Sequence, residues 1–127
     1  MERPAGRRLA KGIAMGIQEW SDDILVVELA DDPQLSDDLA AAGARLETKP
    51  GDVVLNFAAV GFINSSNIAK LLRLRKTIVS AKRRLVLCDV NTHVWGVFMV
   101  TGLDRIFEFT RDIATALATV QMNGQKP

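Results

Sequence analysis

Residues 60–72 read VGFINSSNIAKLL and join a buried strand to an amphipathic helix. The preceding residues 53–57, VVLNF, are nearly all apolar, as in a strand that is covered on both faces. Apolar residues after residue 66 recur at helical spacing, namely Ile68, Leu71, Leu72, Ile78 and Val79. Asn64, Ser65 and Ser66 are good N-cap residues between the two segments. The pattern therefore places two serines where a strand turns into a helix.

This position of Ser66 allows two interpretations. The first backbone N–H groups of a helix lack partners within the helix, and the helix dipole is positive at that end. A phosphate on Ser66 could be accommodated there, and it would bring about −1.5 to −2 charges to the surface. Serines in the same position also serve simply as helix caps. The residues alone leave both interpretations open.

The rest of the chain alternates strands and helices. We expect strands at residues 13–20 and 24–29, with a Ser-Asp-Asp turn between them, and a helix that begins at Asp32-Pro33. Further along we expect a helix over 66–81, a strand over 84–90, a helix over 92–100 that ends at Gly102, a strand over 105–110 and a helix over 111–122. This alternation predicts an α/β fold with parallel strands in the middle of the sheet, because short crossovers join parallel strands.

Length and composition limit the class of protein. With 127 residues, 48% of them hydrophobic, we expect one domain over residues 12–123, a flexible basic tail at 1–11 and a frayed end at 124–127. A formal net charge of +1 argues against a dedicated nucleic-acid binder. No run of about 18 apolar residues is present to span a membrane, and the basic start does not resemble a signal peptide. A cytoplasmic protein is therefore expected, with its single cysteine, Cys88, in the core.

Three motifs resemble those of the STAS domain, the domain of sulphate transporters and anti-sigma factor antagonists. Residues 62–68, FINSSNI, resemble its Phe-hydrophobe-Asp-Ser-Ser-Gly-hydrophobe signature, with Asn64 and Asn67 in place of Asp and Gly. Residues 84–88, RLVLC, resemble its third core strand, and residues 101–107, TGLDRIF, resemble its Thr/Ser-Gly-Leu-x-x-hydrophobe-Phe motif. The similarity extends from about Ile13 to Met122. It implies a mixed sheet with largely parallel central strands and about four helices packed mainly on one face.

The resemblance also implies a function. In bacterial anti-sigma factor antagonists the second serine of the signature is phosphorylated by a partner kinase, which is also the anti-sigma factor. Ser66 is then the candidate phosphorylation site, and Asn64, Ser65, Ser66 and Asn67 form the candidate partner-binding loop. The expected partner is an anti-sigma factor or serine kinase of the same signalling pathway, and a homodimer is left open. We expect neither nucleic acid nor a membrane as a partner.

Two other functions stay open. The substitutions at Asn64 and Asn67 suit a STAS scaffold that binds partners constitutively, without phosphorylation. A small enzyme or anion-binding protein that uses the helix start at Ser66 is the third hypothesis. Against it, His93 has no Cys or His companions at metal-ligand spacing, and Asp37 and Asp38 are expected to be solvated because neighbours on a helix do not face each other. We therefore expect no catalytic residues, no metal and no cofactor.

A possible partner surface lies further along the same helix. Residues 70–84 carry the most basic patch of the chain, which suits either a helix C-terminus or an acidic partner. Leu74 lies off the main apolar stripe and is expected to be exposed beside these cations. We predict Lys70, Arg73 and Leu74 as the partner surface.

Overall fold

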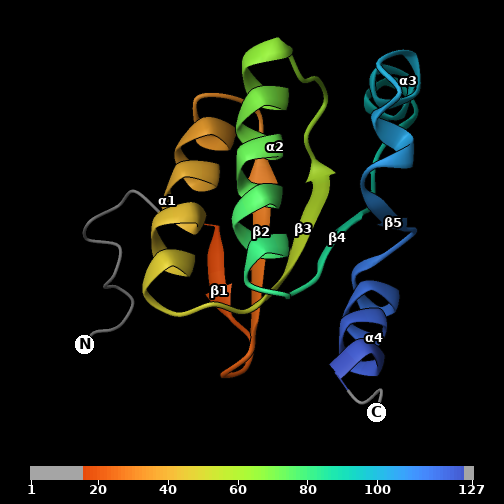
Figure 1. The fold of residues 1–127 in the computed structure, drawn as a ribbon. Helices are drawn as coiled ribbons and strands as arrows, with labels where there is room; N and C mark the ends of the chain where they lie inside the picture. The colour runs from red at the N-terminus through yellow and green to blue at the C-terminus, as the bar shows by residue number, and fades with distance from the viewer. Residues whose placement is uncertain (1–15, 125–127) are drawn as a thin grey trace, which may run out of the picture.

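A five-stranded sheet forms the centre of the computed structural model, which describes residues 16–124 (Figure 1). Its strands lie in the order β1 (Ile17–Glu19), β2 (Ile24–Ala30), β3 (Asp52–Ala59), β4 (Leu85–Cys88) and β5 (Glu108–Thr110). β1 pairs with β2 in antiparallel fashion, and the other three pairings are parallel. The predicted mixed sheet with parallel central strands is thus confirmed.

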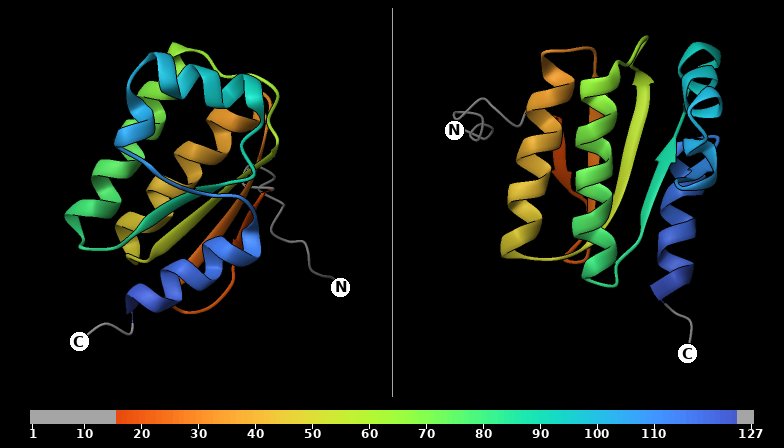
Figure 2. Two further views of the ribbon diagram at one scale, coloured as in Figure 1. Left: turned by 90° about the vertical axis from the view of Figure 1, so that its right-hand side faces the viewer. Right: turned by 45° about the horizontal axis from the view of Figure 1, so that its top comes forward.

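Helices cover both faces of this sheet. They are α1 (Gln34–Thr48), α2 (Ser65–Ser80), α3 (Thr92–Val100) and α4 (Ile113–Gly124), with a short 3-10 helix, η2 (Leu103–Arg105), after α3. α1, α2 and α3 lie on one face, and α4 lies on the other, as the left view of Figure 2 shows. The prediction of helices mainly on one face is therefore confirmed. Within residues 16–124, no helix has the length and apolar character needed to cross a membrane.

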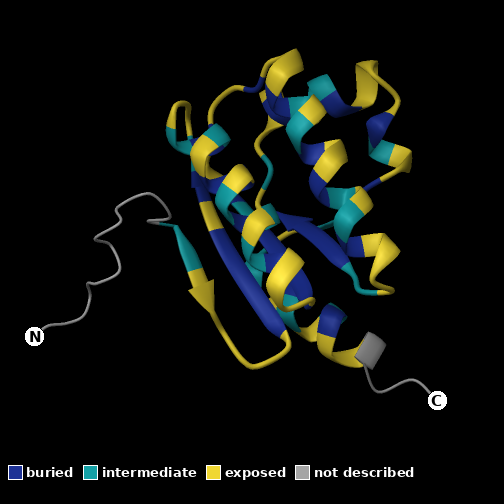
Figure 3. Ribbon diagram, turned by 60° about the vertical axis from the view of Figure 1, so that its left-hand side comes forward, coloured by how far each residue is buried: buried dark blue, intermediate teal, exposed yellow. Residues whose placement is uncertain are grey.

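Alternation along the central strands separates two hydrophobic layers. In β2, Leu25 and Val27 pack with α1, α2 and α3, whereas Val26 packs under α4 together with Val54 and Val86. This is the period-two pattern of a strand that is buried on both faces. Figure 3 shows the result as a buried sheet centre beneath helices whose outer faces are exposed. The sheet thereby fixes the loops at the carboxyl ends of its parallel strands.

The structure differs from the prediction at several element ends; β4, for example, ends at Cys88, two residues before the predicted end. Pro33, not Asp32, takes the N-cap position of α1, although Oδ1 of Asp32 still accepts a hydrogen bond from the Ser36 backbone N–H at 2.8 Å. The last strand begins at Glu108 because Gly102, at φ +78°, ends α3 and leads into η2. α4 ends at Gly124, two residues after the predicted end at 122. The predicted tail at 1–11, the strand start at 13–15 and residues 125–127 lie outside the described residues.

Candidate functional site

The serine loop, which we define as residues 60–67, comprises the connection after β3 and the first three residues of α2, at the carboxyl edge of the sheet. Two neighbouring loops hold its backbone. The Gly61 N–H donates to Oδ1 of Asp31 at 2.8 Å, and the side chain of Asn91 donates to the Val60 carbonyl at 2.9 Å. The Ile63 side chain is buried in the core below. The loop is therefore fixed between the segments that follow β2 and β4.

Two asparagines cap α2 reciprocally. Oδ1 of Asn64 accepts from the Asn67 backbone N–H at 2.9 Å, and Oδ1 of Asn67 accepts from the Asn64 backbone N–H at 3.0 Å. This is a capping box, which satisfies two backbone donors that the helix leaves unpaired. The predicted cap is confirmed. Asn64 accepts the bond that an Asp would accept, but it adds no charge, and the first turn of α2 contains no acidic residue.

The Asn67 side chain also ties α2 to α1. It is only 1% exposed, and its Nδ2 donates to Oδ2 of Asp32 at 2.9 Å and to Oγ of Ser36 at 3.4 Å. The bond from Asn67 is the main cause that lowers the pKa of Asp32, with Ser36 and Lys70 acting in the same direction against desolvation. The side chain therefore points inward and adds no bulk to the outer surface of the loop. This link was not predicted from the sequence, in which the Asp-Pro helix start is its only signal.

The outer surface of the serine loop is polar and aromatic. Ser65 and Ser66 are exposed, and Oγ of Ser66 accepts a hydrogen bond from Nζ of Lys70, one helical turn on, at 3.0 Å. Phe62 is 58% exposed, and its ring stacks on His93 with centroids 6.5 Å apart. Among the described residues, no side chain accepts a hydrogen bond from the Ser66 hydroxyl, as a general base would. The arrangement suits an exposed hydroxyl beside a cation, and it lacks the partners of a catalytic nucleophile.

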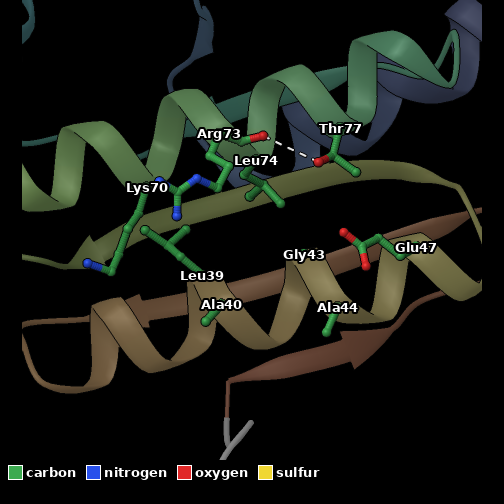
Figure 4. A pocket seen from close by; sticks show the side chains of 9 residues that line it. All are labelled: Leu39, Ala40, Gly43, Ala44, Glu47, Lys70, Arg73, Leu74 and Thr77. Carbon is green, nitrogen blue, oxygen red and sulfur yellow. Dashed lines mark hydrogen bonds between the residues drawn. The ribbon is translucent and has the colours of Figure 1, made fainter.

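Leu74 is buried, in contrast to the predicted exposed position beside Lys70 and Arg73. The expected exposure is wrong, because Leu74 is only 3% exposed and faces Gly43 of α1. α2 packs against α1 as well as against the sheet, so its buried face is rotated away from the predicted stripe, and Leu72 and Val79 are exposed instead. Lys70 and Arg73 do lie near Leu74, along one side of a groove between α1 and α2 (Figure 4).

Other candidate residues are structural. Asp37 is exposed as expected, but Asp38 is fully buried, and Oδ2 of Asp38 accepts from Nε2 of Gln34 at 3.1 Å. Burial raises the pKa of Asp38, so the expectation of a solvated pair is wrong. Cys88 is buried as predicted, and desolvation raises the pKa of its thiol to about 12. Across residues 16–124, no group of three or more His, Cys, Asp or Glu side chains is placed to hold a metal ion.

Comparison with known proteins identifies relatives along most of the chain. The family model of the STAS domain matches residues 9–116. BtrV of Bordetella bronchiseptica, provisionally named an anti-sigma factor antagonist, is 31% identical over 93 residues, which are 73% of this chain and 78% of BtrV.

Solved structures share the fold at lower identity. A Thermotoga maritima protein, also provisionally described as an anti-sigma factor antagonist, has a TM-score of 0.73 at 19% identity and covers 83% of this chain and 92% of its own. The anti-sigma factor antagonist SpoIIAA of Bacillus, in its unphosphorylated form, has a TM-score of 0.66 at 14% identity over 83% and 96% of the two chains. At these identities the likeness shows the fold alone.

Proposed function

The chain belongs to the STAS domain family, and on that premise we propose that it acts as an anti-sigma factor antagonist. In this role it binds an anti-sigma factor and so releases the sigma factor that the anti-sigma factor holds. The 31% identity to BtrV supports the proposal, as does the absence of a general base beside the serines in the described part of the chain. The domain acts by binding, and the partner supplies any chemistry.

We further propose that phosphorylation of Ser66 switches this binding off. The observation that carries the proposal is the exposure of Ser66 on a loop whose backbone is fixed on both sides. A kinase can reach such a hydroxyl, and the fixed backbone presents it in one conformation. Asn67 does not obstruct access because its side chain is buried. One of the structures with the same fold, that of Bacillus SpoIIAA, was solved in a phosphorylated form.

The charge of the phosphate determines how strongly phosphorylation weakens the complex. Phosphoserine carries about −1.5 to −2 charges at pH 7. Where the partner excludes water from Ser66, phosphorylation would bury this charge in the interface. Misplaced charge in an interface costs several kcal/mol, and each 1.4 kcal/mol is a tenfold change in affinity. We therefore expect phosphorylation to weaken the complex by at least about 100-fold.

A constitutive STAS scaffold is the second candidate. It is favoured by the asparagine capping box, which fixes the loop without any carboxylate or phosphate. In a scaffold the same loop would bind its partner in one state only. The two candidates differ in whether a kinase modifies Ser66.

The cytoplasmic location, the homodimer that was left open and the lack of nucleic-acid and membrane partners remain predictions.

A phosphorylation assay separates the candidates. The full chain is incubated with purified anti-sigma factors and serine kinases of its own organism, ATP and magnesium, and is then analysed by intact-mass and peptide mass spectrometry. Ser66→Ala and Ser65→Ala serve as matched variants, since both serines are exposed in the same loop. We expect one phosphate on the wild type and on Ser65→Ala, and none on Ser66→Ala. Binding of an active kinase without any phosphate on the chain would favour the scaffold.

A further inference from the structure

An open groove of about 310 Å³ runs between α1 and α2, on the outer side of the helix layer (Figure 4). Its floor is apolar, because Leu39 of α1 and Leu74 of α2 meet there. The two helices run in the same direction, and the lining on α2 extends from Lys70 to Thr77, which is about 10 Å of helix. The groove is long and straight enough to receive the side of another helix.

Gly43 opens the middle of this groove. Glycine inside a helix is destabilising relative to alanine, so its presence calls for a reason. Packing gives none, because a Cβ on Gly43 would meet only Cδ1 of Leu74, at the ordinary contact distance of 3.9 Å. The missing side chain instead keeps the space above Leu39 and Leu74 free. The sequence therefore loses helix stability at a position where the missing side chain leaves an open space above a buried apolar floor.

The two ends of the groove differ in charge. Lys70 and Arg73 lie at the end nearer Ser66, and Glu47 lies at the other end, as Figure 4 shows. Arg73 is exposed, and within residues 16–124 no carboxylate lies within ion-pair distance of either cation. An exposed arginine beside an apolar surface is a frequent anchor in protein interfaces.

We propose that this groove, which we call the α1–α2 groove, binds a helix of the anti-sigma factor. That helix has an apolar face against Leu39 and Leu74, a carboxylate that meets Lys70 and Arg73, and a basic residue at the Glu47 end. The inference rests on the proposed function and adds a second contact area to the serine loop. Lys70 belongs to both areas, because it also donates to Oγ of Ser66. A phosphate on Ser66 would compete with the partner's carboxylate for this cation.

The test measures the affinity of four variants for the anti-sigma factor that binds the wild type in pull-down. Gly43→Leu fills the groove, and Arg73→Glu reverses the charge at its end. Gly96→Leu is the matched control for size, because Gly96 lies inside α3 and a Cβ there meets nothing within 4 Å. Lys76→Glu is the matched control for charge, because Lys76 is exposed on α2 outside the groove lining.

We expect Gly43→Leu and Arg73→Glu to lose at least tenfold in affinity by isothermal titration calorimetry, and the two controls to change less than twofold. The loss for Arg73→Glu should shrink at high salt. Circular dichroism checks that each variant is folded, and Arg73→Glu, at an exposed position, keeps the test valid if Gly43→Leu does not fold.

Four outcomes would overturn the inference. Unchanged affinity of Gly43→Leu and Arg73→Glu would exclude the groove while the proposed function stands. A larger loss in Gly96→Leu than in Gly43→Leu would place the partner on α3. Self-association of the wild type that Gly43→Leu abolishes would assign the groove to a second copy of the chain. If no anti-sigma factor binds the wild type at all, the proposed function and the groove both fail.

Discussion

Replacing Asn67 by alanine removes three side-chain hydrogen bonds that hold the start of α2. They join Asn67 to the Asn64 backbone N–H, to the Asp32 carboxylate and, more weakly at 3.4 Å, to Ser36. A hydrogen bond between neutral groups contributes about 0.5–1.5 kcal/mol, and one to a charged group about 1.5–3 kcal/mol. Water can replace the bond at the exposed Asp32, and alanine gains about 0.5 kcal/mol of helix propensity. We therefore expect a net loss of about 2 kcal/mol in the free energy of unfolding.

Urea and thermal unfolding, followed by far-UV circular dichroism, measure this loss. For a domain of this size about 2 kcal/mol corresponds to a fall in Tm of roughly 8 °C. A double-mutant cycle with Asp32→Ala isolates the bond between Asn67 and Asp32, and we expect a coupling of about 1 kcal/mol. Gln121→Ala, at an exposed position on α4, is the control for the change to alanine.

The pH dependence of the loss follows from the pKa of Asp32. This pKa is lowered in the folded protein from 3.8, mainly by Asn67, so the bond stabilises the fold above that pH. Its contribution is lost as the pH falls through the lower folded value. The difference between wild type and Asn67→Ala should then be full at pH 7 and shrink below about pH 4. A loss of less than about 0.5 kcal/mol in the free energy of unfolding at pH 7 would refute the argument. So would a loss that is equal at pH 7 and below about pH 4.

Three further outcomes follow from single sites. Phosphorylation of Ser66 should raise the free energy of unfolding by about 0.5–1 kcal/mol at low salt, because the first turn of α2 has no acidic residue and Nζ of Lys70 lies 3.0 Å from Oγ of Ser66. An equal rise on phosphorylation of the Lys70→Gln variant would contradict this reasoning. Burial raises the pKa of the Cys88 thiol to about 12, so Cys88 should resist thiol reagents at pH 8 in the native protein and react with them in urea. Rapid labelling of the native protein would contradict its burial. Gly102 has φ +78°, so Gly102→Ala should lower the free energy of unfolding by about 1 kcal/mol in chemical denaturation, whereas Gly96→Ala should be neutral or stabilising. The reverse order of stability would refute the left-handed conformation of Gly102.

The sequence was informative where one segment determines its own structure. The helix cap at Asn64 and the turn at Gly102 depend on residues at most a few positions apart, and both were predicted. The strand–helix order follows in the same way from local apolar periodicity. These features place the serine loop at the carboxyl edge of the sheet, so the position of the candidate site could also be predicted.

Contacts between distant segments could not be predicted. Asn67 and Asp32 are 35 residues apart, and the Asp-Pro helix start does not by itself indicate that their side chains meet. Leu74 was expected at the surface because the position of α1 beside α2 is not visible in the periodicity of α2 alone. Asp38 looked solvated for the same reason, since its burial depends on Gln34 and on the segment that starts at Gly16. In each case tertiary packing decided which face of a helix became the buried one.

The most direct test of the Ser66 switch compares one complex in two states. Phosphoserine is incorporated at position 66 during translation, so that the result does not depend on which kinase acts. Incorporation at Ser80, an exposed serine at the other end of α2, is the control for charge alone. Calorimetric titration with the bound anti-sigma factor should show an affinity at least about 100-fold weaker for the chain modified at Ser66, and little change for the chain modified at Ser80. Equal affinities of the unmodified chain and the chain phosphorylated at Ser66 would contradict the switch.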